Sequence, residues 1–254
     1  AGKLSGNHKE VMEEDTNAAG KNNVKALASL LERRSPQKTR KTWRREKPPW
    51  DALAYGCFEL RIRDATLRIA ESYSSTGTRV WDTAIAMAKM LEREPSVVKD
   101  RNVLELGSGT GILGMAAAEL GSRSCVLTER EALLPTLAAS VRANAANCTV
   151  RCLDWNEPNC ADLCGFDVIV ASDTLVCVQW SAGLVRVLLA LAGVGTRVLV
   201  GSDSHRDGVP HFLHHMRPHF TVAEVPASKY HPDFFCHDLV VFDCVRQRPA
   251  AGRD

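Results

Sequence analysis

Three glycines at alternate positions follow a short apolar segment that contains a single acid. The stretch runs Val103-Leu-Glu-Leu-Gly-Ser-Gly-Thr-Gly111, and the residues after it, 112–120, are rich in Ala and Leu. Because glycine has no Cβ, a turn rich in glycine can approach a ligand closely. A turn that leads from a strand into a helix also directs free backbone N–H groups at that ligand. The segment therefore predicts a ligand site at the carboxyl end of a parallel strand.

The acid and the glycines together indicate which ligand binds there. Glu105 lies inside the strand and can accept a hydrogen bond from a cationic amino group, a pattern typical of S-adenosylmethionine sites. The rival ligand is a dinucleotide, because residues 109–114 also match G-x-G-x-x-G. A pyrophosphate gains nothing from a neighbouring carboxylate, so the pattern favours S-adenosylmethionine. The turn residues predicted to contact it are Gly107, Ser108, Gly109 and Gly111.

Further polar and aromatic residues stand where the next predicted strands end. Glu129 ends the second strand and can accept hydrogen bonds from both ribose hydroxyls. Asp154 and Trp155 end the third strand, where an aromatic face and an acceptor suit an adenine. Ser172 and Asp173 end the fourth strand, and Asp173 is the candidate for holding a substrate amine. The alternative role for Asp173 is the N-cap of the following helix.

The elements that must position these residues alternate between strand and helix. Alternating βα units predict a parallel sheet with helices on both faces. The strands are predicted near 102–107, 123–128, 149–153, 166–171 and 196–201, and the helices near 112–120, 131–146, 178–192 and 209–217. Thr221–Val225 and Leu239–Val245 follow as two strands with no helix between them, which predicts an antiparallel C-terminal hairpin. The fold class is therefore α/β, a doubly wound, Rossmann-like seven-strand methyltransferase sheet.

A second hairpin is predicted before the sheet. Apolar residues alternate from Phe58 to Ile69 around a turn at Arg63–Ala65, which places this hairpin at about 56–80. An amphipathic helix follows from about Thr83 to Arg93, with Asp82 as its predicted N-cap.

The first 50 residues differ in composition from the rest. They are polar and predict a flexible tail that cofactor binding does not require, in front of a methyltransferase domain at 51–250. The basic run at 38–47 favours a solvated tail over a nuclear signal or a nucleic-acid patch.

The whole composition excludes several classes of protein. The 254 residues are 45% hydrophobic and carry a net charge of +2, which predicts one globular domain with no broad affinity for nucleic acid. No apolar run reaches the length of a membrane span. Nine scattered cysteines without a C-x-x-C pair indicate a reducing compartment, so we expect a cytoplasmic protein, with the nucleus as a second location. We also expect a monomer. No metal is predicted, because no cysteine or acid spacing accompanies the histidines His205, His211, His214, His215 and His219.

Taken together, these motifs resemble the seven-strand protein-lysine methyltransferases, which include the chaperone and elongation-factor lysine methyltransferases. The resemblance covers about 55–245, and beyond the glycine turn it is carried by Gly77-Thr-Arg-Val-Trp81-Asp82, Leu127-Thr-Glu129, Asn144-Ala-Ala-Asn147 and Leu153-Asp-Trp155. It implies S-adenosylmethionine as cofactor, contacts to it from Trp81 and from the position of Ser172, and a protein substrate such as a chaperone or a translation factor.

One position departs from the family pattern. The family has Asp-x-x-Tyr after the fourth strand, whereas this chain has Asp173-Thr-Leu-Val176. The aromatic wall of the lysine channel is therefore missing at Val176. Lysine remains the predicted acceptor, and histidine, arginine or a small amine are the alternatives. A binding module that keeps the fold without catalysis is a further alternative.

Overall fold

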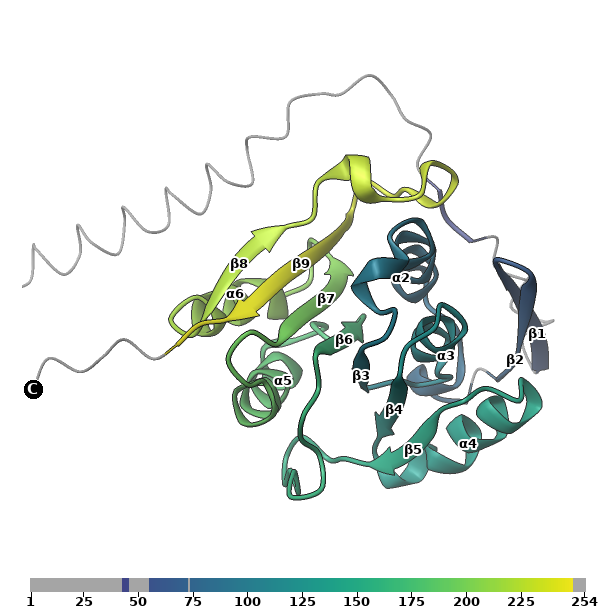
Figure 1. Ribbon diagram of the computed structural model, residues 1–254, viewed down its shortest axis with the longest axis horizontal. Coiled ribbons are helices and arrows are strands. Elements are labelled where there is room, and N and C mark those ends of the chain that lie inside the picture. The colour runs from purple at the N-terminus through teal and green to yellow at the C-terminus, as the bar shows by residue number, and fades with distance from the viewer. Residues whose placement is uncertain (1–42, 46–54, 73, 249–254) are drawn as a thin grey trace, which may run out of the picture. The chain divides into compact units, whose positions relative to one another are not determined.

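Seven strands form the central sheet (Figure 1). Across the sheet they are β5 (Thr149–Cys152), β4 (Ser124–Glu129), β3 (Asn102–Leu106), β6 (Val168–Ser172), β7 (Arg197–Asp203), β9 (Leu239–Arg246) and β8 (Phe220–Glu224). The strands from β5 to β7 are parallel, while β9 runs antiparallel to both β7 and β8. The predicted seven-strand sheet and its C-terminal hairpin are confirmed. This computed structural model describes residues 43–45, 55–72 and 74–248.

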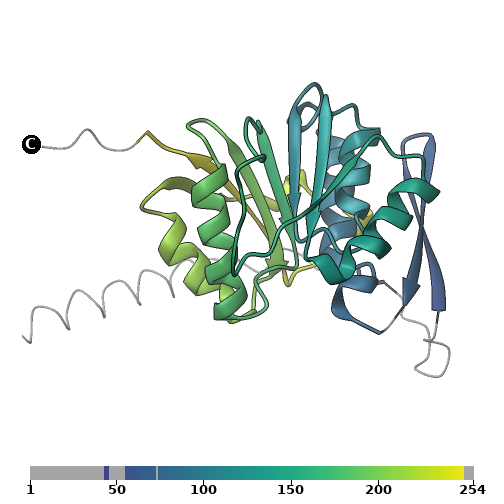
Figure 2. The same cartoon turned by 90° about the horizontal axis from the view of Figure 1, so that it is seen from below.

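Helices cover both faces of the sheet (Figure 2). One face carries α2 (Asp82–Arg93), α3 (Ile112–Glu119) and α4 (Leu134–Ala143), and the other carries α5 (Val178–Leu191) and α6 (Gly208–Met216). Side chains of the central strand alternate between the two cores: Val103 packs with the first group of helices and Leu104 with the second. This arrangement explains why β3 reads as a continuous apolar run with one acid. Within the described residues, no helix is long and apolar enough to cross a membrane.

The predicted N-terminal hairpin is present as β1 (Tyr55–Ile62) and β2 (Ala65–Ser72). It ends at Ser72, before the predicted limit near residue 80. A two-residue turn joins the strands, and Arg63 adopts a left-handed φ of 51° there. Ile62 and Ile69 are fully buried against the helices of the first face, so the hairpin extends that core.

Two predicted helix starts are wrong, each for a local reason. The helix predicted over 131–146 opens instead as a 3-10 turn, Glu131–Leu133, and only then becomes α4. Pro135 lies in the first turn of α4, where its missing N–H is tolerated, whereas a continuous helix would place it in the interior. In α2 the N-cap is Trp81, and Asp82 is the first helical residue. The Asp82 carboxylate instead forms an ion pair with Arg44 at 3.6 Å.

The described residues before the hairpin contact the domain, although they fall in the range predicted as a tail. Trp43 donates its backbone N–H to the carbonyl of Phe235 at 2.7 Å. Arg45 forms a bidentate ion pair with the buried carboxylate of Glu71 in β2. The remainder of the predicted tail lies outside the described residues.

Candidate active site

A cavity of about 390 Å³ opens where β3, β4, β5 and β6 end. Its volume lies in the range of about 300–1,000 Å³ that small-molecule sites occupy. The strand order reverses between β3 and β6, and ligands of open α/β sheets bind at such a switch point. Nine of the predicted site residues line it: Trp81, Gly107, Ser108, Gly109, Glu129, Asp154, Trp155, Ser172 and Asp173.

The glycine turn shapes one wall of this cavity. Gly107 has a φ of 67°, and a Cβ there would lie 3.1 Å from the Trp155 ring and 3.2 Å from Thr174. A side chain at this position would therefore be strained and would crowd the cavity wall. Gly109 donates its N–H to Oε2 of Glu129 at 3.0 Å. The turn and the end of β4 are thereby held together.

The carboxylate of Glu129 is oriented by backbone on both sides. Its Oε2 accepts from Gly109, and its Oε1 accepts from the N–H of Arg130 at 3.0 Å. Each oxygen retains a lone pair, and the side chain lines the cavity. This is the geometry that a pair of neighbouring hydroxyls requires.

Glu105 and Gly111 do not line the cavity, contrary to the prediction from the glycine motif. The Glu105 side chain is buried, and its Oε2 accepts from the N–H of Gly114, the third residue of α3, at 3.1 Å. Burial raises the pKa of Glu105 to about 8, although hydrogen bonds from Ser108 and Gly114 lower it. The acid therefore caps the helix from behind the turn. A Cβ on Gly111 would lie 2.6 Å from Leu137, so this glycine is required by core packing.

The wall formed after β5 is aromatic. Trp155 lies close to Gly107 on one side and to Gly183 of α5 on the other, where a Cβ would approach it to 3.0 Å. Asp154 is exposed and accepts from the N–H of Asn156 at 2.8 Å, which fixes the turn that presents Trp155. Trp155 is thus held between the glycine turn and α5, and it lines the cavity.

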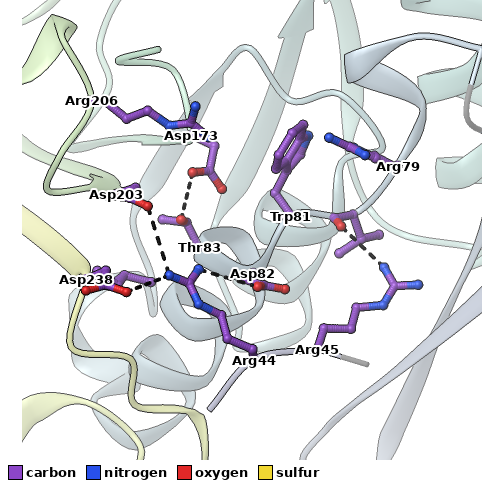
Figure 3. A pocket seen from close by; sticks show the side chains of 12 residues that line it. Arg44, Arg45, Arg79, Trp81, Asp82, Thr83, Asp173, Asp203, Arg206 and Asp238 are labelled. Carbon is purple, nitrogen blue, oxygen red and sulfur yellow. Dashed lines mark hydrogen bonds and ion pairs between the residues drawn. The ribbon is translucent and has the colours of Figure 1, made fainter. Parts of the chain in front are cut away.

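Asp173 stands at the end of β6 in a left-handed conformation, with a φ of 54°. Its Oδ1 accepts a hydrogen bond from the hydroxyl of Thr83 at 2.8 Å (Figure 3). Burial raises the pKa of Asp173 to about 6, against the lowering effects of Thr83 and of the charge on Arg206. It does not cap the next helix, because the N-cap of α5 is Cys177. The alternative reading as a helix cap is therefore wrong.

A second, smaller cavity of about 140 Å³ lies on the other side of Asp173 (Figure 3). The residues that line both cavities are Arg79, Trp81, Asp173 and Arg206. The smaller cavity is strongly charged, because Arg44, Asp82, Asp203 and Asp238 also line it. Asp173 therefore faces two spaces of different character, one with an aromatic wall and one with many charges.

Several site residues carry no motif and were missed in the sequence. Arg79 stacks over the Trp81 ring at 3.8 Å, and the Trp81 indole N–H donates to the carbonyl of Thr76 at 2.9 Å. Trp180, which is 41% exposed, lines the larger cavity from the first turn of α5. Arg206 follows β7. Only Arg79 had a signal, since it lies inside the motif Gly77–Asp82 that carries the family resemblance.

The residues of the larger cavity fit S-adenosylmethionine. The carboxylate oxygens of Glu129 can accept hydrogen bonds from the ribose hydroxyls, and the apolar ring of Trp155 suits the adenine base. The glycine turn allows the ligand to approach the backbone closely. The hydroxyl of Thr174 is buried at this cavity without a hydrogen-bond partner among the described residues, as expected for a group that a ligand completes.

The histidine cluster does not form a metal site. The ring centroids of His211 and His215 lie 4.3 Å apart on α6 with a tilt of 44°, and His211 shares a hydrogen bond with Ser181 at 3.0 Å. In the described part of the chain, no group of three His, Cys, Asp or Glu side chains is arranged to hold a metal ion.

Fold and cavity together define an S-adenosylmethionine-dependent methyltransferase. A solved structure of the T. thermophilus 16S rRNA N2 G1207 methyltransferase RsmC, in complex with AdoMet and guanosine, has a TM-score of 0.56. Its sequence identity is 19%, over 80% of this chain and 53% of that chain, so the likeness concerns the fold.

Sequence comparison identifies the family. A family model described as lysine methyltransferase matches residues 62–219, and the chain belongs to this family. The protein N-lysine methyltransferase METTL21A of Danio rerio is 29% identical over 188 residues, which is 70% of this chain and 85% of that relative. METTL21A of Xenopus tropicalis is 30% identical over 59% of this chain and 71% of its own. The protein-lysine N-methyltransferase EEF2KMT of Mus musculus is 33% identical over 47% of this chain and 41% of its own.

Proposed function

We propose that this protein transfers a methyl group from S-adenosylmethionine to the Nζ atom of a lysine in a protein substrate. The observation that carries the proposal is the position of Asp173, which lines both cavities. With the cofactor in the larger cavity, an acceptor that enters through the smaller one meets it beside this carboxylate. Membership of the lysine methyltransferase family supports lysine as the acceptor.

The residues of this chain have to align the acceptor rather than activate the donor. When bound, S-adenosylmethionine supplies a methyl group that its sulfonium charge has already activated. A lysine has an ordinary pKa of about 10.4 and must lose a proton before it reacts. Entry into a partly buried space favours that loss through desolvation. Alignment then supplies much of the rate.

Asp173 is placed to perform this alignment. With a pKa of about 6, it is a carboxylate at neutral pH and can accept a hydrogen bond from the incoming nitrogen. Thr83 engages Oδ1, which leaves Oδ2 for the acceptor. A carboxyl with this pKa is a weak base, so its contribution is orientation, and the proton leaves to solvent.

We include in this proposal that Trp180 replaces the family tyrosine. Val176, which stands at the tyrosine position, lines the larger cavity but offers only a small apolar surface. Trp180, four residues later in the first turn of α5, lines the same cavity and supplies an aromatic face. A wall formed by Trp180 would differ in shape from one formed by the family tyrosine and could select a different acceptor. Histidine, arginine and a small amine are therefore the alternatives that the test below separates.

The test is transfer of a labelled methyl group from S-adenosylmethionine into unfractionated cell lysate. Labelled bands are identified by mass spectrometry and hydrolysed to amino acids. Methyl-lysine in one protein band is the expected product; methyl-histidine, methyl-arginine or a labelled small molecule would refute the lysine assignment. We propose a chaperone or a translation factor as the substrate, in keeping with the resemblance, and the identity of the band tests this separately.

We also propose that the protein acts as a monomer in the cytoplasm, with the nucleus as a second location. Large apolar side chains exposed among the described residues are scattered, and two of the four, Val178 and Trp180, lie at the start of α5 beside the cavity. Sedimentation and imaging of the tagged full chain test the two statements.

A further inference from the structure

The segment Trp43–Arg45 is anchored on both sides of the smaller cavity. On one side, Trp43 donates its N–H to Phe235 at 2.7 Å and its ring lies 5.1 Å from that of Phe234. On the other side, Arg45 pairs with the buried Glu71 and donates to the carbonyl of Val80 at 3.3 Å. The segment is therefore stretched across the rim of the cavity as a strap.

Between these anchors, Arg44 extends its guanidinium into the smaller cavity (Figure 3). It lies 3.0 Å from Asp238, 3.6 Å from Asp82 and 4.0 Å from Asp203. These three acids come from the loop before β9, from the start of α2 and from the end of β7. The side chains of Arg44 and Asp238 remain 47% and 46% exposed, so water competes for this contact.

The position of Arg44 coincides with the route that an acceptor needs. In Figure 3, Thr83 lies between Arg44 and Asp173, and all three line the same cavity. A lysine approaches in its charged form, so the acids that hold Arg44 would also attract the incoming lysine. Two cations held by the same three carboxylates would repel each other at this distance.

We propose that Arg44 is an internal occupant of the acceptor entrance, and that a basic protein substrate must displace Arg44, and with it the Trp43 end of the strap, to reach Asp173. This inference rests on the proposed function and adds a blocked form of the free enzyme to it. The contacts that are broken are the ion pairs of the half-exposed Arg44 side chain and the Trp43 hydrogen bond, while the buried Arg45–Glu71 pair stays in place. Arg44 therefore competes with the substrate without abolishing activity.

The first test follows the strap itself by hydrogen exchange at the Trp43 amide. The probe is hexalysine, added to the full chain saturated with S-adenosylhomocysteine, with hexaglutamate as the control for ionic strength. Hexalysine should accelerate exchange at Trp43, and Arg44→Ala should accelerate it about two- to fivefold without any peptide, the range that exposed ion pairs support. Arg68→Ala is the matched control, because it removes an arginine from an exposed ion pair on the hairpin. Unchanged exchange in both conditions overturns the proposal.

The second test separates competition from substrate binding. Initial methyl transfer into lysate is measured across lysate dilutions. Arg44→Ala should raise the rate about two- to fivefold at high dilution and leave it unchanged at saturation. A lower rate at high dilution would show that Arg44 helps to bind the substrate and would overturn the inference. If the wild type labels no protein, the proposed function fails, while exchange at Trp43 still reports the strap.

Discussion

Asp173→Asn removes one negative charge and replaces one carboxylate oxygen with an amide NH2 group. Asparagine adopts the left-handed conformation as readily as aspartate, so the φ of 54° can be kept. Its side-chain oxygen can still accept from the Thr83 hydroxyl, which donates to Oδ1 at 2.8 Å. The substitution therefore removes the negative charge while the backbone and the hydrogen bond remain.

The pKa of Asp173 determines how stability should respond. Burial raises it from 3.8 to about 6, so ionisation of this group costs the folded state free energy. The stabilising contribution of the protonated form is complete below pH 3.8 and is lost as the pH rises through about 6. Each pH unit is worth about 1.4 kcal/mol, and the interval spans about two units, so the upper limit is about 3 kcal/mol. Because the Asp173 side chain keeps some solvent exposure, screening reduces the expected gain in the variant to about 1–2 kcal/mol.

Urea denaturation at a series of pH values measures this difference. Asp173→Asn should be more stable than the wild type at pH 7.5, and the gap should close as the pH falls from about 6 towards 4. Asp100→Asn is the matched control, because Asp100 is exposed and also has a left-handed φ, of 58°. This control measures how an Asp-to-Asn change at an exposed left-handed position alters stability. If Asp173→Asn is less stable than the wild type at pH 7.5, the charge of Asp173 does not destabilise the folded state.

The same variant tests the role of Asp173 in catalysis. If the carboxylate orients the acceptor nitrogen, methyl transfer should fall by about 100-fold, as for a misaligned reactant. Affinity for S-adenosylhomocysteine, measured by calorimetry, should stay within a few-fold, since the glycine turn and Glu129 are untouched. Full activity in this more stable variant would show that alignment does not depend on the charge.

Three further substitutions separate the roles of the other acids. Glu129→Ala should weaken binding of S-adenosylhomocysteine by about tenfold or more in calorimetry, because charge-assisted hydrogen bonds to two hydroxyls are lost; unchanged affinity in a folded variant would place the ribose elsewhere. Glu105→Gln should leave that affinity within twofold, because Glu105 lies outside the cavity. Burial raises the pKa of Glu105 from 4.5 to about 8, so the stability that its protonated form confers is lost as the pH rises from 4.5 to about 8. In urea denaturation, the free energy of unfolding of Glu105→Gln should therefore increase relative to that of the wild type over this pH range. A large loss of affinity would restore Glu105 as a ligand contact. Arg45→Ala leaves the buried Glu71 carboxylate without its cation and should lower the free energy of unfolding by about 3 kcal/mol. The surface control is Arg68→Ala. A change no larger than that of the control would contradict a stabilising role for the Arg45–Glu71 pair.

Local chemistry determined the parts of this protein that could be predicted from the sequence. The glycine turn, the strand that precedes it and the helix that follows depend on neighbouring residues, and they lie where they were predicted. The two terminal strands without a helix between them distinguished this sheet from an ordinary dinucleotide fold. The carboxyl ends of parallel strands meet at one edge, so Glu129, Trp155 and Asp173 reached the same cavity.

The direction in which a buried side chain points could be decided only by tertiary packing. Glu105 lies in the motif but faces the N-terminus of α3, because the adjacent space is filled by the core and a backbone N–H needs an acceptor there. Asp173 is paired with Thr83, which lies 90 residues away in the chain. Arg44 meets three acids from three separate elements. Such contacts leave no local pattern, since each residue is ordinary in its own segment, and only the folding of the sheet and its helices brings them together.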